Sequence, residues 1–189
     1  MSYRRLLPIL QPKTPASILL VLLLLLMSGA GSVSRAGAMG SVEAPPREAP
    51  PDLASPITDQ AGSEIRIADF VGSPVLINFW ATWCAPCIAE LPALSRAAAA
   101  LADDDITVLL VSIDRGGAAK AMPFLDTHGV TGVRLGFDPK ARLSRNMQVR
   151  GLPTTLLLPA GQDAAWRFVG PFEWDDPDML SLVRDLVVE

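Results

Sequence analysis

The spacing of hydrophobic residues changes several times along this chain, and each change marks an expected element. Residues 74–80 (PVLINFW) and 106–114 (ITVLLVSID) are nearly continuous apolar runs, which is typical of strands buried on both faces of a sheet. Residues 64–70 (EIRIADF) alternate apolar and polar positions and indicate a further strand. Helical spacing and turn residues predict the other elements: helices over 84–102, 118–129, 139–147 and 176–189, a short strand over 133–138 and a hairpin over 154–170.

The order of these elements predicts the fold class. Strands and helices alternate first, and the hairpin comes near the end of the chain. Because crossovers between parallel strands are right-handed, the early strands are expected to be parallel. We therefore expect an α/β fold with one mixed central sheet and helices on both faces.

The first 36 residues are expected to direct the chain to a membrane. Three basic residues precede an uncharged stretch of 21 residues, 14–34. Its most apolar part, 18–27, has the length of a signal-peptide core, and small residues at 36–38 offer a cleavage site. An uncleaved anchor is an equally good interpretation, because 21 helical residues span about 30 Å of hydrocarbon. Both alternatives place the rest of the chain outside the cytoplasm.

The remaining chain divides into a tether and a domain. Residues 37–51 are rich in Pro, Ala and charge and are expected to form a flexible tether, followed by a folded domain over 52–189. The formal charge of the whole chain is −4. The first 38 residues hold four basic residues and no acidic one, so the rest carries 12 basic against 20 acidic residues. This acidic balance argues against a nucleic-acid partner.

The two cysteines, Cys84 and Cys87, stand three positions apart. A disulfide that closes so short a loop restrains the unfolded chain by only about 2 kcal/mol, against roughly 5 for a loop of a hundred residues, so a structural staple is a poor explanation. If a helix begins at Cys84, its unpaired N–H groups and dipole favour a thiolate there, and Cys87 lies one turn later on the same side. Pro86 in the first turn stiffens the loop. The pair therefore suits reversible exchange, with Cys84 attacking a disulfide and Cys87 resolving the mixed species.

At these residues the chain resembles the thioredoxin superfamily, and more narrowly the membrane-tethered periplasmic thiol-disulfide oxidoreductases typified by TlpA, ResA and CcmG. The likeness covers about residues 50–189. Residues 75–87 (VLINFWATWCAPC) are similar to the second core strand and active-site turn, 90–92 (ELP) to the kinked first helix, and 149–158 (VRGLPTTLLL) to the cis-proline loop. Residues 169–180 (VGPFEWDDPDML) favour the TlpA branch.

The resemblance implies a thioredoxin-like three-layer fold and a role for each matching residue. Cys84 matches the exposed nucleophile and Cys87 the buried resolving thiol. Pro153 matches a proline that follows a cis peptide bond, an isomer almost confined to proline. The Leu152 backbone would pair with a substrate strand, and Trp83 would flank the mouth of the site. The residues expected at the substrate-binding and cis-proline loops are thus Trp83, Pro86, Leu152 and Pro153.

The general base is not assigned by the resemblance. Thioredoxin has a buried aspartate at the position of Asn78, and some relatives have glutamate where this chain has Ala85. Glu90, one turn beyond Cys87, is a candidate base. The favoured interpretation of Glu90, however, is a solvated helix carboxylate.

The expected function is that of an enzyme, an extracytoplasmic protein disulfide reductase with no cofactor besides the redox-active Cys84–Cys87 pair. The resemblance implies a periplasmic location and a client protein with a disulfide in cytochrome c or cytochrome oxidase (copper site) assembly. It also implies a membrane-bound electron donor. Alternatives are a net disulfide oxidant, a docking domain without turnover, or a copper carrier that uses the two thiols. The only histidine, His128, is expected to lie far from the redox turn, so no metal site is predicted.

Overall fold

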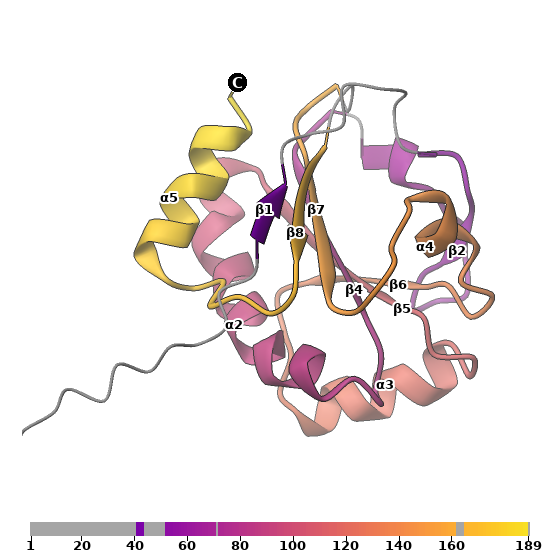
Figure 1. Cartoon of the computed structure of the whole chain (residues 1–189). Helices are drawn as coiled ribbons and strands as arrows, with labels where there is room; N and C mark the ends of the chain where they lie inside the picture. The colour runs from indigo at the N-terminus through magenta and orange to yellow at the C-terminus, as the bar shows by residue number, and fades with distance from the viewer. Residues whose placement is uncertain (1–40, 44–51, 71, 162–164, 189) are drawn as a thin grey trace, which may run out of the picture. The chain divides into compact units, whose positions relative to one another are not determined.

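The computed structural model describes residues 41–43, 52–70, 72–161 and 165–188 (Figure 1). The predicted signal or anchor segment, residues 1–36, lies outside this part of the chain. None of the helices within it has both the length and the apolar character needed to cross a bilayer.

The strands of the described residues form one sheet in the order β1-β8-β7-β4-β5-β6-β2-β3. Their bounds are Ser41–Glu43 (β1), Ile57–Thr58 (β2), Glu64–Ile65 (β3), Val75–Trp80 (β4), Thr107–Ser112 (β5), Arg134–Phe137 (β6), Thr154–Leu158 (β7) and Trp166–Val169 (β8). As predicted, β4, β5 and β6 are parallel, and β7 and β8 form an antiparallel hairpin beside β4. The sheet is therefore mixed.

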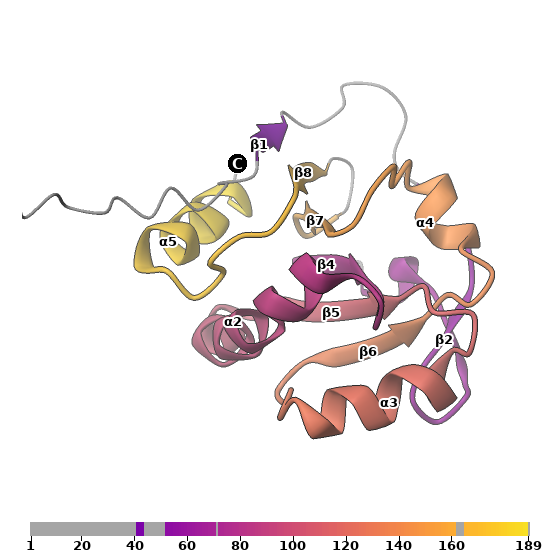
Figure 2. The same cartoon turned by 60° about the horizontal axis from the view of Figure 1, so that its bottom comes forward.

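The helices cover both faces of the sheet, as expected for the predicted fold class. They are α2 (Ala85–Leu101), α3 (Ala118–Thr127), α4 (Arg142–Asn146) and α5 (Pro177–Leu186), with short 3-10 turns at η1 (Ile67–Phe70) and η2 (Ala102–Asp104). Apolar residues of α2, α3 and α5 pack on one face, and residues of η1 and α4 pack on the other. Figure 2 shows α2 and α5 side by side.

Strand β4 is the centre of the core because all six of its side chains are buried. Leu76 and Trp80 belong to the cluster under α2, whereas Val75, Ile77 and Phe79 belong to the opposite cluster. This alternation follows from the period of two along a strand. It also assigns Asn78, between Leu76 and Trp80, to the face that α2 covers.

Two predicted elements differ in the structure. Only Glu64–Ile65 of the expected strand 64–70 is a strand, and a 3-10 turn follows because the Asp69 carboxylate accepts a hydrogen bond from the Arg66 N–H. The expected helix at 139–147 begins at Arg142 rather than on Pro139. There the Asp138 carboxylate accepts hydrogen bonds from the backbone N–H groups of Arg142 and Ser144, so the helix starts three residues later.

The segment expected to be a flexible tether contains strand β1. Its residues, Ser41–Glu43, pair antiparallel with Arg167–Val169 of β8 at the edge of the sheet. A tether over 37–51 therefore does not describe these three residues. The domain boundaries at 36 and 51 remain predictions.

Candidate active site

The redox turn, residues 81–87, connects the end of β4 to the start of α2. Cys84 is the N-cap of α2, and its Sγ accepts a hydrogen bond from the Cys87 N–H at 3.3 Å. The Cys84 N–H in turn donates to the Ala81 carbonyl at 3.1 Å. Cys84 and Cys87 form a disulfide, with their Cα atoms 5.3 Å apart. The sequence placed the first sulfur beside the free N–H groups of a helix start, and the structure agrees.

The two sulfur-bearing residues differ little in exposure. Cys84 is 6% exposed and Cys87 is fully buried, so Cys84 is less open in this disulfide form than the resemblance implied. Trp83 is 68% exposed and projects from the turn, and Pro86 is exposed in the first turn of α2. The exposed Trp83 indole is thus the neighbour of Cys84 in the chain, and its role at the mouth of the site stays a prediction.

The loop before β7 lies next to the redox turn. Thr154 pairs with Phe79, so Pro153 stands beside the end of β4 from which the turn leaves. The Leu152–Pro153 peptide bond is cis, as the resemblance implied. Pro153 is buried and Leu152 is half-buried, and the Pro153 carbonyl accepts a hydrogen bond from the Gly170 N–H. Contact of this loop with a substrate remains a prediction.

Glu90 is buried, which corrects the favoured interpretation of a solvated carboxylate. Its side chain is 3% exposed. Oε1 accepts a hydrogen bond from Asn78 Nδ2 at 2.7 Å. Oε2 accepts two more, from the Phe172 N–H at 3.2 Å and from Trp174 Nε1 at 3.1 Å. The chain therefore does hold a buried carboxylate one turn beyond Cys87, on the helix rather than at Asn78 on the strand.

Burial governs the protonation of Glu90. Removal from water raises the pKa of its carboxyl to about 7, although the hydrogen bonds from Asn78, Phe172 and Trp174 oppose this rise. A carboxyl with such a pKa exchanges a proton near neutral pH. This is the protonation behaviour that a proton acceptor for a thiol requires.

Asp114 anchors the redox turn from the end of the neighbouring strand, a role that no local sequence pattern predicts. It follows β5 and is 3% exposed. Its carboxylate accepts hydrogen bonds from the Thr82 N–H at 2.9 Å and from Thr82 Oγ1 at 2.8 Å. Ser112 Oγ donates a third, at 3.0 Å. Thr82 is two residues before Cys84, so Asp114 fixes the start of the turn that carries Cys84.

The ring contacts of His128 in the described part of the chain are with Phe124 and not with Cys84 or Cys87. Its ring stacks on Phe124 with centroids 4.0 Å apart, and Nδ1 lies 2.8 Å from the Phe124 carbonyl oxygen. Among the described residues, no group of three His, Cys, Asp or Glu side chains is arranged to hold a metal ion. The arrangement around the sulfurs is instead a disulfide, a helix start and a buried carboxyl.

Comparison with known proteins gives relatives that match about half of the chain. It is 29% identical over 96 residues to the thiol-disulfide oxidoreductase ResA of Oceanobacillus iheyensis, covering 51% of this chain and 49% of that one. It is 34% identical over 104 residues to the thiol:disulfide interchange protein HelX of Rhodobacter capsulatus, covering 55% and 56%. The chain therefore spans about half the length of these curated relatives. The preference for the TlpA branch stays a prediction.

Solved structures support the thioredoxin-like fold. The thiol:disulfide interchange protein, thioredoxin family protein from Chlorobium tepidum superposes with a TM-score of 0.59 at 20% identity. The match covers 72% of this chain and 98% of that one. The sequence model of the AhpC/TSA family matches residues 43–162, more than half of the chain. The chain thus belongs to the AhpC/TSA family and has a thioredoxin-like fold.

Proposed function

We propose that this protein is a thiol-disulfide oxidoreductase that reduces disulfides of partner proteins through Cys84 and Cys87. The observation that carries the proposal is the disulfide at the start of α2, where the Cys87 N–H donates to Cys84 Sγ. The same N–H and the helix dipole stabilise a Cys84 thiolate once the bond is reduced. Relatives named as thiol-disulfide oxidoreductases support the same activity.

The proposed reaction is a two-electron exchange. In the reduced protein, the Cys84 thiolate attacks one sulfur of the client disulfide, and the other client sulfur leaves as a thiolate. The Cys87 thiol then loses its proton, and its sulfur attacks Cys84 Sγ. This step releases the second client sulfur as a thiolate and re-forms the Cys84–Cys87 bond. The client gains two electrons, and a dithiol donor must return two electrons to the protein before the next cycle.

Glu90 is the proposed acceptor of the Cys87 proton. Both side chains are buried, and three positions along a helix place them on the same face. With a pKa of about 7, Glu90 is partly ionised at neutral pH and able to take the proton.

The location and the client class belong to the same proposal. The basic flank and uncharged stretch of residues 1–36 support an extracytoplasmic protein that is tethered to the inner membrane or secreted. The resemblance of residues 75–87 and 149–158 to the TlpA, ResA and CcmG group supports a client in cytochrome or cytochrome oxidase assembly.

A trapping experiment tests the proposed function. In a Cys87→Ala variant the mixed disulfide through Cys84 cannot be resolved, so it should accumulate in cells with the client and be identified by mass spectrometry. The matched Cys84→Ala variant should trap no partner. Equal trapping by both variants, or by neither, contradicts the assignment of Cys84 as nucleophile.

The direction of transfer needs a separate measurement. Equilibration of the purified protein in glutathione buffers gives the midpoint potential of the Cys84–Cys87 pair. A reductant requires a potential below that of its compartment. A midpoint well above that value would make the protein a net oxidant that donates its disulfide.

A further inference from the structure

Residues 115–150 carry a charge opposite to that of the rest of the chain. This segment has seven basic and two acidic residues, whereas the other residues beyond position 38 comprise five basic and 18 acidic. All seven basic side chains are exposed. Of the two acids, Asp138 is buried on backbone N–H groups and Asp126 lies in the last turn of α3. An exposed basic region thus stands out on an acidic protein.

Six of these cations lie in the loops and short helices that follow β5 and β6 or precede β7, and we call them the basic rim: Arg115, Lys120, Lys140, Arg142, Arg145 and Arg150. Strands β4, β5 and β6 are parallel, so the redox turn, the loop with Arg115 and the loop with Lys140 leave the same edge of the sheet. Strand β7 is antiparallel to β4 and begins at that edge, four residues after Arg150.

Local contacts join these loops to one another. Asp114, the residue before Arg115, binds Thr82 of the redox turn through two hydrogen bonds. The loops after β5 and β6 also meet, because a Cβ on Gly117 would lie 3.9 Å from the Pro139 ring. The loop with Arg115 therefore adjoins the redox turn, and the loop with Lys140 adjoins the loop with Arg115.

The cations of the basic rim form no ion pair with another described residue. Elsewhere in the described residues, Arg66 pairs with Glu64, Arg96 with Asp175 and Arg184 with Asp104. Within the same ranges no carboxylate pairs with a side chain of the basic rim, and Arg145 donates only to the Lys140 carbonyl. On the other side of the redox turn, the segment after β8 carries Glu173, Asp175 and Asp176. Asp175 of this segment pairs with Arg96 of α2, whereas Glu173 and Asp176 are exposed.

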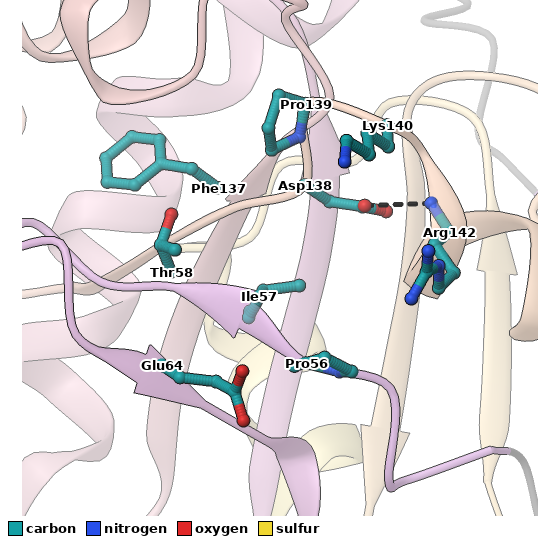
Figure 3. A pocket seen from close by; sticks show the side chains of 9 residues that line it. All are labelled: Pro56, Ile57, Thr58, Glu64, Phe137, Asp138, Pro139, Lys140 and Arg142. Carbon is teal, nitrogen blue, oxygen red and sulfur yellow. Dashed lines mark hydrogen bonds between the residues drawn. The ribbon is translucent and has the colours of Figure 1, made fainter.

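A pocket of about 220 Å³ opens within the basic rim (Figure 3). Lys140, Arg142 and Asp138 line it on one side, and Ile57 and Phe137 contribute apolar surface. The Asp138 carboxylate already accepts the N–H groups of Arg142 and Ser144. Glu64 lies on the β3 side in Figure 3, where Arg66 already pairs with its carboxylate. The volume is smaller than the 300 to 1,000 Å³ that is usual for small-molecule sites, and it suits a single side chain.

We propose that the basic rim binds an acidic segment of the client polypeptide, which places the adjoining client disulfide against Cys84. An Asp or Glu side chain of that segment enters the pocket between Lys140 and Arg142. The rest of the segment lies along the loops after β5 and β6, away from the acidic segment after β8. This inference rests on the proposed function and adds the chemistry by which a client is selected.

The test compares disulfide peptides that differ only in charge. Two peptides with the same disulfide carry either Asp or Lys residues beside it, and reduced protein is mixed with each in a stopped-flow experiment. At low salt the acidic peptide should react about tenfold faster, because complementary charge acts mainly on association. The advantage should disappear at 1 M salt, where the Debye length is about 3 Å.

Two double variants with the same change in net charge locate the effect. Lys140→Glu with Arg142→Glu should abolish the preference for the acidic peptide. Arg96→Glu with Arg184→Glu reverses two cations outside the basic rim and should retain the preference. Equal loss in both double variants would overturn the inference, because only the total charge would then matter.

A neutral substrate separates this inference from the proposed function. If the protein does not reduce bis(2-hydroxyethyl) disulfide at all, the proposed function fails. If it reduces that substrate but shows no preference between the peptides, only the acidic client segment is overturned. Binding of phosphatidylglycerol vesicles through Lys140 and Arg142, without a peptide preference, would also overturn it and assign the basic rim to a membrane surface.

Discussion

Asn78 of the central strand donates a hydrogen bond through Nδ2 to Oε1 of Glu90 at 2.7 Å, and both side chains are buried. The amide also donates to Thr155 Oγ1 at 2.9 Å. This contact links β4, α2 and β7 directly behind the redox turn. The strand supplies a neutral donor and the helix supplies the carboxylate, so the ionisable group belongs to the element that also carries Cys87.

The buried carboxyl predicts a specific dependence of stability on pH. The folded pKa of Glu90 is about 7, above its value of 4.5 in the unfolded chain, so the folded state binds the proton more tightly between these values. Stability should therefore fall as pH rises from about 4.5 to 7 and level off above. In a Glu90→Gln variant this fall should be smaller by about 2 to 3 kcal/mol between pH 5 and 8.

Urea unfolding of the disulfide form at several pH values measures this difference. Glu173→Gln is the matched control, because Glu173 is exposed and lies between the two residues that donate to Glu90. The control should keep the pH dependence of the unmodified protein. Parallel curves for Glu90→Gln and the unmodified protein would contradict a buried titrating carboxyl.

The burial of Glu90 shows where local sequence patterns stop being informative. Buried runs at β4 and β5, the CxxC helix start and the β7–β8 hairpin all follow from local spacing, and each was predicted. Glu90 lies in an Ala-rich helix with weak polar contrast, so a solvated position was the natural interpretation. Two of its three donors, Phe172 and Trp174, are 82 and 84 residues away in the chain. Only the tertiary fold brings them together.

Local sequence patterns are also uninformative for the loop before α4 and the loop after β5. Asp138 ends a predicted strand, and the rule for proline at a helix start placed the next helix on Pro139. The structure uses the Asp138 carboxylate for the first N–H groups of α4 instead, with Ala141 in the left-handed region at φ 50°. The tendency of proline to begin a helix is thus overridden by the hydrogen bonds to the Asp138 carboxylate. The Asp114–Thr82 contact, 32 residues apart, likewise has no local signal.

The anchoring of the redox turn by Asp114 predicts coupled stability effects. Asp114→Ala removes three accepted hydrogen bonds and should cost about 2 to 4 kcal/mol. Thr82→Ala should cost about 1 kcal/mol alone and almost nothing in the Asp114→Ala background. Chemical denaturation of the two single variants and the double variant gives the coupling energy. Additive costs would mean that Thr82 and Asp114 act independently.

Substitutions of Trp83 and Trp174 should affect different properties, the rate of exchange for Trp83 and the free energy of unfolding for Trp174. Trp83 is 68% exposed, so Trp83→Ala should change the free energy of unfolding by less than about 0.5 kcal/mol. It should slow exchange with a protein client while leaving exchange with bis(2-hydroxyethyl) disulfide nearly unchanged. Trp174 is 1% exposed and donates to Glu90, and Trp174→Ala should cost about 3 to 5 kcal/mol. Denaturation and exchange rates measured on both variants check this contrast.

The docking of β2 on β6 depends on a missing side chain at Gly136. A Cβ on Gly136 would lie 2.6 Å from Cδ1 of Ile57, which is itself 3% exposed and held in the core. Gly136→Ala should therefore cost about 1 to 3 kcal/mol through overpacking. Ile57→Val removes the clashing Cδ1 and alone should cost about 1 kcal/mol.

The double variant distinguishes a clash with Ile57 from a cost that arises only because glycine is replaced. If Cδ1 is the obstacle, the double variant Gly136→Ala with Ile57→Val should lose less unfolding free energy than the two single variants lose together. The difference should be about 1 kcal/mol or more. Thermal or urea unfolding of all four proteins completes the cycle. Ile57→Val together with Gly72→Ala is the control, because a Cβ on Gly72 meets no atom within 4 Å and its effect should simply add. Strict additivity at Gly136 as well would show that Ile57 moves aside, and that β6 tolerates a side chain there.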